Sequence, residues 1–485
     1  MTALDPRTPI IVGVGVATQR PERVEDGVEA TALMRVATEH ALADCGAPQL
    51  GDRIDACLVP EGIWSYPDPG RLVLDGRSPG ARTLLAAVGV LQQTLFSRGA
   101  ADIASGRCEA VLICGAETMW STRAFASSGV GIPVTTQGDD VHPEVRLDPA
   151  DEIITDVEIH RGLAVPAHQY AVIESARRAA LRRSPEDHAT AVAEGVARLS
   201  SVAAANPDAW IRTPMSTAEV LAAPMIATPY TRPSISQWTV DQAAASIMTS
   251  VGTAERLGIP RDRWVFAVLG VESNLMVPLT ERALMGRSPA MAAAAAGARS
   301  AGVDLAAADL LEIYSCFPAA VSVQCEELGI EPGRQLSVTG GMHFAGGPLN
   351  SFSLQAMSMM VDQLREGAGA TALVTSISGM ITKFGAGTWS TAPPQRPFRS
   401  LDVSDEAGRR TARVAVDPDY AGRSVIAGWT VGHTRGVPAE AVVVCDTPDG
   451  MRAVATSTDP DLAAALTAGE WVGRTVEVRG PLLLG

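Results

Sequence analysis

Two segments far apart in the chain follow one pattern: a helical stretch, a short turn that ends in glycine, and an apolar strand. The first segment covers residues 94–115 and the second covers residues 353–376. An offset of 261 residues places Gly106 on Gly367, at the same point of each turn. Few residues are identical between the segments, so the matching order of elements carries the comparison. It predicts a duplicated α/β unit with an active cleft where the two halves meet.

Short apolar runs bounded by turn residues alternate with stretches of helical spacing along most of the chain. The predicted strands are residues 9–15, 54–59, 83–90, 110–114, 264–271, 310–313 and 370–376. The predicted helices are residues 28–45, 94–105, 166–181, 185–206, 288–301, 319–328 and 353–366. This alternation favours a mainly parallel sheet covered by helices. The glycines of Lys383-Phe-Gly-Ala-Gly predict a turn.

The density of strand and helix signals divides the chain into four parts. Residues 1–119 and 262–390 are the predicted α/β halves, and residues 120–261 form a mainly helical loop insertion with few strands. A proline-rich linker follows the second half. Beyond it, short evenly spaced strands over residues 401–485 predict an additional antiparallel β-barrel.

Charge and cysteine usage exclude several classes of protein. The chain has 39 basic and 54 acidic residues, a net charge of −15, and no basic run that would suit nucleic acid or an anionic membrane. No apolar run reaches the ~18 residues of a membrane span, and no secretory signal is visible. The seven cysteines are odd in number and form no CxxC pair, so we expect no metal site and a cytoplasmic location.

Three segments resemble motifs of the thiolase superfamily, nearest its sterol-carrier-protein-type branch. Residues 102–119 resemble the helix and strand that follow the family's nucleophilic cysteine. Leu311-Glu-Ile-Tyr-Ser-Cys-Phe resembles the NEAF or HDCF segment, and Gly340-Gly-Met-His-Phe-Ala-Gly-Gly-Pro resembles the loop that ends in GHPxG. The resemblance covers about residues 5–390, and it implies a duplicated thiolase fold that handles CoA thioesters.

Thiolase chemistry requires a cysteine nucleophile, a second cysteine, a histidine, and a water held by Asn or His. Aligned with these motifs, the nucleophile position falls on Gly89 and the histidine of GHP falls on Gly347. The Asn or His position falls on Tyr314, and the second cysteine falls on Ser376 or, two residues on, Ser378. All four expected groups are missing. We therefore expect ping-pong thiolase activity to be absent.

Three residues near these positions remain as catalytic candidates. Tyr314 has a phenol that could donate to an enolate oxygen, or it packs at a strand end. Cys316 is a displaced nucleophile or, as in the family's own HDCF segment, a small buried apolar residue. His343 lies in the glycine-rich loop. It either reaches the cleft from a backbone position other than that of the missing histidine, or serves as a local hydrogen-bonding residue.

The glycine-rich loop also supplies candidate ligand-binding residues. Gly340, Gly341 and Gly346 would let backbone N–H groups approach a thioester oxygen, and the same glycines would form tight turns. The resemblance implies that CoA or an acyl-CoA binds as a ligand, with no covalent cofactor and no metal. It places the CoA contacts in the insertion.

Three functional hypotheses follow. The first is a protein that binds CoA or CoA thioesters, with a possible unusual acyltransferase role in lipid metabolism. The second is a retro-aldolase that cleaves a β-hydroxyacyl-CoA with Tyr314 and His343, supported slightly by the barrel, because related lyases work with OB-like partners. The third is a non-catalytic scaffold. Thiolases are mostly dimers or tetramers, and the sequence leaves the oligomeric state open.

Overall fold

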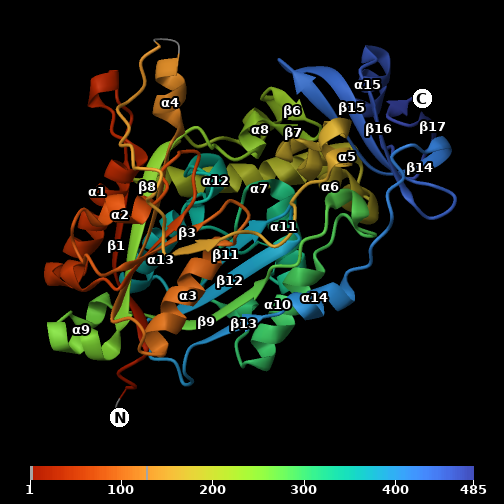
Figure 1. The fold of residues 1–485 in the computed structure, drawn as a ribbon. Helices are drawn as coiled ribbons and strands as arrows, with labels where there is room; N and C mark the ends of the chain where they lie inside the picture. The colour runs from red at the N-terminus through yellow and green to blue at the C-terminus, as the bar shows by residue number, and fades with distance from the viewer. Residues whose placement is uncertain (1–3, 127–128, 332, 485) are drawn as a thin grey trace.

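A large mixed sheet forms the centre of the molecule in the computed structural model, which describes residues 4–126, 129–331 and 333–484 (Figure 1). Its strands are β1 (Pro9–Thr18), β2 (Ala56–Pro60), β3 (Arg82–Ala86), β4 (Ala110–Thr118), β5 (Val145–Leu147), β8 (Asp241–Ser250), β9 (Val265–Ser273), β10 (Leu310–Glu312), β11 (Thr371–Ser378), β12 (Lys383–Ser390) and β13 (Arg399–Asp402). Their order is β10-β11-β12-β9-β1-β8-β4-β2-β3-β5, and β13 lies beside β9.

The prediction of a mainly parallel sheet is wrong for the centre of this sheet. Strand β1 pairs antiparallel with both β8 and β9, and β12 pairs antiparallel with β9 and β11. Parallel pairs occur towards the two edges and where β13 joins β9. Strands β1 and β8 are buried on both faces along nearly their whole length, so their sequences show no alternation that would separate antiparallel from parallel pairing.

The helices form layers on and between the two halves of the sheet. They are α1 (Ala30–Asp44), α2 (Pro69–Leu74), α3 (Gln92–Ala104), α4 (Met119–Phe125), α5 (Asp156–Glu158), α6 (Pro166–Ala180), α7 (Pro185–Ala205), α8 (Thr217–Ala222), α9 (Val251–Leu257), α10 (Pro289–Ser300), α11 (Pro318–Leu328), α12 (Gly341–Phe344), α13 (Phe352–Arg365), α14 (Ser404–Arg410) and α15 (Pro460–Thr467). Helices α3 and α13 contact strands of both halves, whereas α1 covers the N-terminal half and α10 the C-terminal half. None of the helices in the described part of the chain has the length and apolarity needed to cross a bilayer.

The duplication predicted from the sequence is confirmed by the sheet order. Outward from the centre, β1, β8, β4 and β2 of the first half correspond to β9, β12, β11 and β10 of the second. Helix α3 leads into β4, and α13 leads into β11. Strands β4 and β11 begin at Ala110 and Thr371, which keeps the offset of 261 residues.

Two local predictions are wrong. The segment 120–261 is not all insertion, because it contains β8, which lies between β1 and β4 at the centre of the sheet and is followed by α9. The predicted turn after Lys383 is the beginning of the buried strand β12. Its two glycines mark a close approach: an added Cβ at Gly385 would lie 2.8 Å from the Gln93 Cβ, and one at Gly387 would lie 2.5 Å from the Gln93 Oε1.

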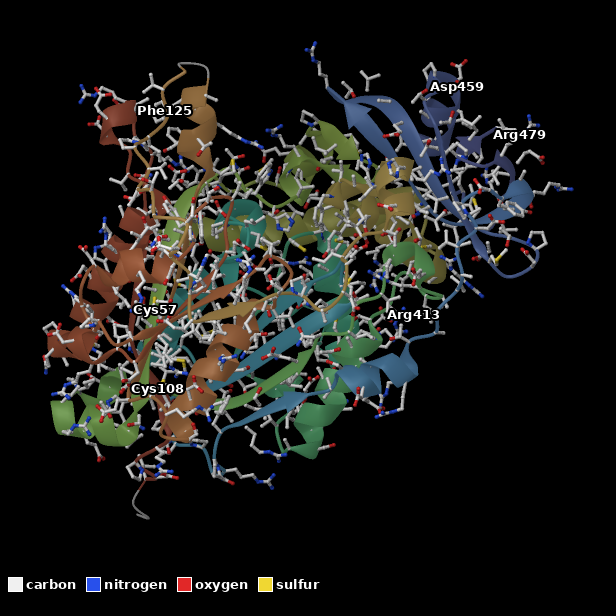
Figure 2. The ribbon with its side chains drawn as sticks, in the orientation of Figure 1. Cys57, Cys108, Phe125, Arg413, Asp459 and Arg479 are labelled. Carbon is white, nitrogen blue, oxygen red and sulfur yellow. The ribbon has the colours of Figure 1, made fainter. Side chains whose placement is uncertain are left out.

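The C-terminal residues form the small antiparallel barrel that the sequence predicts. Its strands are β14 (Ala421–Thr434), β15 (Val437–Asp446), β16 (Arg452–Ser457), β17 (Thr475–Arg479) and β18 (Leu482–Leu483). Pairing runs from β14 through β15, β16, β18 and β17 back to β14, so the ring of five strands closes. Helix α15 connects the third and fourth strands, an arrangement typical of an OB-like barrel. Figure 2 shows Asp459 and Arg479 on this barrel, apart from the half that carries Cys57 and Cys108.

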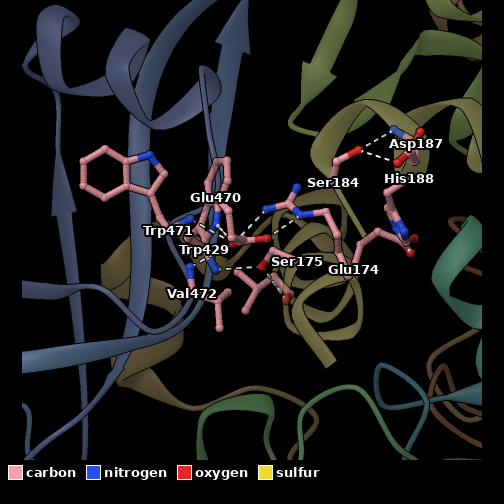
Figure 3. Close-up of polar contacts among 11 residues, drawn as sticks. Glu174, Ser175, Ser184, Asp187, His188, Trp429, Glu470, Trp471 and Val472 are labelled. Atoms are coloured by element: carbon pink, nitrogen blue, oxygen red, sulfur yellow. Dashed lines mark hydrogen bonds and ion pairs between the residues drawn. The ribbon is translucent and has the colours of Figure 1, made fainter. Parts of the chain in front are cut away.

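The barrel docks on the insertion through α6 and a short hairpin, β6 (Met225–Ala227) and β7 (Tyr230–Thr231). Strand β14 pairs with β6 at Gly432 and Ala227. Glu470 of the barrel accepts two hydrogen bonds, at 2.8 and 3.0 Å, from the buried Arg178 guanidinium of α6. Figure 3 shows Glu470 directed at α6, beside Trp429, whose backbone N–H donates to the Ser175 hydroxyl.

We predict that Glu470→Gln loosens the barrel from the insertion. The change leaves the Arg178 charge buried without its carboxylate partner, and breaking a buried pair costs ~3–5 kcal/mol. Because the Glu470 side chain is 32% exposed, we expect a smaller loss, about 1–3 kcal/mol. Hydrogen exchange of the β14 amides should accelerate. Glu477→Gln, at an exposed position on β17, is the control, and equal exchange in the two variants would contradict the prediction.

Candidate functional site

The predicted nucleophile position, Gly89, lies between β3 and α3 beneath the loop of residues 148–154. Its φ of +103° belongs to the left-handed region that favours glycine. An added Cβ would lie 2.8 Å from Ile153 Cδ1 and 3.2 Å from Pro149 Cγ. A cysteine therefore fits at this position only if the Ile153 side chain or the loop that carries it shifts.

The two halves meet at the N-terminus of α3, next to Gly89. The Gln93 backbone N–H donates to the hydroxyl of Ser376, at the predicted position of the second cysteine, over 3.3 Å. The Ser353 N–H, in the first turn of α13, donates to the Gln92 side-chain oxygen over 2.6 Å. Ser378, the other candidate for that position, lies on the same strand opposite Lys383. The structure thus brings the nucleophile and second-cysteine positions together in one place.

Tyr314 is buried beside this junction. Its ring meets Phe352 edge-on, with centroids 5.8 Å apart. Burial raises the pKa of the phenol well above its usual 10, and a hydrogen bond with the Gln92 side chain partly opposes that effect. Tyr314 is therefore a neutral phenol near neutral pH, able to donate a hydrogen bond.

Cys316 follows Tyr314 by two residues and contacts the insertion. Burial raises the pKa of its thiol to about 12, and a hydrogen bond with the Tyr170 hydroxyl only partly opposes this. The thiolate, which is the nucleophilic form, is scarce at neutral pH for such a group. The environment suits a structural thiol better than a nucleophile.

His343, on α12, is also buried, and its imidazole is directed towards the insertion. Nε2 lies 3.2 Å from the Ser234 carbonyl oxygen. Nδ1 has no hydrogen-bond partner within the described chain. Burial lowers the pKa of His343 to about 4, so the ring is neutral near pH 7. His343 contacts neither Gln92 nor Tyr314 by a hydrogen bond in this structure.

The glycine-rich loop uses much of its backbone hydrogen-bonding capacity internally. The N–H of Gly340 donates to the Ser337 hydroxyl, and the N–H of Gly341 donates to the Thr339 hydroxyl. These two N–H groups have no free proton for a thioester oxygen in this conformation. Gly346 approaches β8 so closely that an added Cβ would overlap the Gln242 side-chain oxygen. A histidine at Gly347 would be crowded by Met342, whose Cε would lie 3.1 Å from an added Cβ.

One charged residue at the junction has no place in the predicted catalytic set. Lys383, at the start of β12, is 3% exposed, and its Nζ donates to the carbonyl oxygen of Gly89 over 2.6 Å. Lys383 is also the only lysine among the chain's 39 lysine and arginine residues. The sequence shows that this lysine is unique, but only the fold shows its position against Gly89.

Neither a metal site nor a large cavity coincides with the candidate residues in the described part of the chain. Among the described residues, no group of three or more His, Cys, Asp and Glu side chains is arranged to hold a metal ion. A cavity of about 220 Å³ lies between β1 and α13, and its lining includes Asp208 and Asp362. None of the candidate residues lines this cavity.

We predict that Gly89→Ala displaces the covering loop. The matched control is Gly76→Ala, because Gly76 also has a positive φ, +83°, but an added Cβ there meets no atom within 4 Å. Crowding against the loop should make Gly89→Ala less stable than the control by about 1 kcal/mol. Limited proteolysis within residues 148–154 should accelerate only in Gly89→Ala. Identical behaviour of the two variants would show that the position has room for a side chain.

Comparison with known proteins supports the fold. A family model described as "Thiolase-like protein type 1 additional C-terminal domain" matches residues 402–480, which include the barrel. The crystal structure of a monomeric SCP2-thiolase-like protein type 1 from Mycobacterium smegmatis is 30% identical, with a TM-score of 0.81. The match covers 99% of this chain and 98% of that one. No curated protein sequence matches the chain.

More distant structures share the fold of the body alone. Human mitochondrial 3-ketoacyl-CoA thiolase is 16% identical, with a TM-score of 0.58, over 80% of this chain and 100% of its own. The Ltp2-ChsH2(DUF35) aldolase is 18% identical, with a TM-score of 0.60, over 80% of this chain and 99% of its own. Since the close match spans both the duplicated body and the barrel, this chain belongs to the SCP2-thiolase-like protein type 1 family.

Proposed function

We propose that this protein binds CoA or a CoA thioester at the junction of its two halves and does not carry out ping-pong thiolysis. The observation that carries the proposal is Gly89, a position without a nucleophile that lies beneath a close-packed loop. Ser376 at the second-cysteine position has a hydroxyl that accepts a hydrogen bond from α3. The protein would retain the fold of a thioester-handling enzyme while its chemistry differs.

The fold supports the choice of ligand. Human mitochondrial 3-ketoacyl-CoA thiolase in complex with CoA aligns with 81% of this chain, with a TM-score of 0.57. If catalytic, the protein would act as an acyltransferase of lipid metabolism by a route that needs no cysteine. All seven cysteines are reduced, which suits the reducing cytoplasm that we propose as its location.

A second candidate function is carbon–carbon cleavage of a β-hydroxyacyl-CoA. In that reaction a base removes the hydroxyl proton, the bond between the α and β carbons breaks, and the thioester enolate accepts a proton at the α carbon. Tyr314, a buried neutral phenol bonded to Gln92, is suited to donate to the enolate oxygen. The aligned fold of the Ltp2-ChsH2(DUF35) aldolase also favours this candidate.

Calorimetric titration with CoA and acetyl-CoA, followed by a thiolysis assay on the same sample, tests the main proposal. We expect binding at micromolar affinity without thiolysis, because the thioester site lacks its nucleophile. An absence of binding at millimolar ligand would reject both candidate functions and favour a non-catalytic scaffold. Rapid thiolysis would show that the catalytic positions are wrongly assigned.

Tyr314→Phe separates the two candidate functions. If the protein is a lyase, loss of the hydroxyl should reduce cleavage of β-hydroxyacyl-CoAs by about 10²-fold or more while CoA affinity stays the same. Tyr66→Phe is the control, since Tyr66 is equally buried but bonds to Glu29 in the N-terminal half. Full cleavage activity in Tyr314→Phe would reject that role for the phenol.

A further inference from the structure

We propose that Lys383 is a carbonyl-reactive amine that condenses with the β-keto group of a β-ketoacyl thioester at the vacated nucleophile position. The inference rests on the proposed thioester site, and it adds a substrate class and a reacting atom. Lys383 Nζ lies 2.6 Å from the carbonyl oxygen of Gly89, the residue that replaces the nucleophile. Its amine is therefore in direct contact with the backbone of the residue at that position.

The surroundings of Nζ favour a neutral amine. An ammonium has three protons to donate, but within the described chain Nζ has one hydrogen bond, to Gly89, and no ion pair. A buried charge with unused donors is costly, whereas a neutral amine needs fewer partners and keeps a lone pair. Burial lowers the pKa of Lys383, and the more distant carboxylates of Asp151 and Glu272 partly oppose this shift.

The residue type is informative because arginine serves at every other basic position of this chain. An arginine guanidinium stays protonated in proteins and cannot form an imine, whereas a buried lysine loses its proton readily. Structural cation sites in this protein, such as Arg178 in α6, use arginine. A single buried lysine at the junction of the halves is therefore best explained by chemistry that arginine cannot perform.

A proton carrier lies on the same face of the sheet. Glu272 of β9 pairs with Gly385 of β12, two residues from Lys383, so the two side chains project to one face. Glu272 is 6% exposed and accepts a 2.5 Å hydrogen bond from the Thr94 hydroxyl in α3. Burial raises the pKa of its carboxyl, which suits a group that gives and takes protons.

The reaction balances with these two groups. Nζ attacks the ketone carbon and forms the C–N bond, and the amine proton passes to the former carbonyl oxygen. Glu272 donates a proton to the resulting hydroxyl, which leaves as water, and the iminium can return a proton to the carboxylate. The net change is amine plus ketone to imine plus water, without an oxidant or reductant. Attack on the thioester carbonyl would instead expel the thiol and leave an amide.

Access requires the loop of residues 148–154 to move away from Gly89. Residues 149–154 make no hydrogen bond in the structure, and Asp151 at their centre is exposed. Ile153 and Pro149 cover Gly89 through apolar contact alone. Segments held in this way open at low free-energy cost.

Reductive trapping tests the proposal on the full chain. The protein is incubated at pH 7 with acetoacetyl-CoA or, separately, with pentane-2,4-dione, each with and without sodium cyanoborohydride, and adducts are located by peptide mass mapping. We expect a reductant-dependent adduct of acetoacetyl-CoA on Lys383. Pentane-2,4-dione should label Lys383 faster than it labels Nα-acetyl-lysine, since a lowered pKa leaves a larger fraction of the amine neutral. Lys383→Met and Lys383→Arg should lose both adducts.

Each outcome decides a separate question. The N-terminal amine is an internal control, so labelling there without labelling of Lys383 by either probe would overturn the proposal, even if the variants fail to fold. An acetoacetyl amide on Lys383 without reductant would also overturn it, because attack then occurs at the thioester. Labelling by pentane-2,4-dione in a protein that binds no CoA would reject the proposed function and leave the reactive amine supported.

Discussion

The fold depends on how closely the two halves approach at the N-terminus of α3. Gln92 receives a hydrogen bond from the first turn of α13, and the Gln93 N–H donates to Ser376 of β11. The Gln93 side chain packs against strand β12, where Gly385 and Gly387 leave room for it because they lack a Cβ. Larger residues there would push α3 from the sheet and separate the halves.

Two of the aligned thiolase positions have little room for a larger side chain in this structure. Gly89 is covered by a loop, and Gly347 is crowded by Met342. The nearby thiol of Cys316 has a pKa raised by burial to about 12, far from that of a reactive cysteine. What remains at the junction is a phenol, Tyr314, and an amine, Lys383, both held by backbone and amide groups. We propose that such a site favours proton transfer or amine chemistry over acyl transfer to sulfur.

The sequence predicted the duplication because the two halves share an order of elements although few residues are identical. One constant offset relates the segment from α3 to β4 to the segment from α13 to β11. The sequence predicted the vacated positions because motif spacing fixes them. The sequence did not reveal β12, because its glycines are typical of a turn. Only the structure shows that these glycines leave room for the Gln93 side chain. The sequence could not predict the docking of the barrel, because Arg178 and Glu470 are 292 residues apart. Lys383 became visible as a candidate only when the fold placed it against Gly89.

The most direct test of the central claim is a search for an acyl-enzyme. The protein is exposed to acetyl-CoA, quenched in acid, and each of its seven cysteines is examined by peptide mass mapping. With Gly89 at the nucleophile position, the account predicts no acetyl group on any cysteine, even at ligand concentrations that saturate binding. A hydroxylamine-sensitive acetyl thioester on a cysteine, formed at a catalytically useful rate, would contradict it.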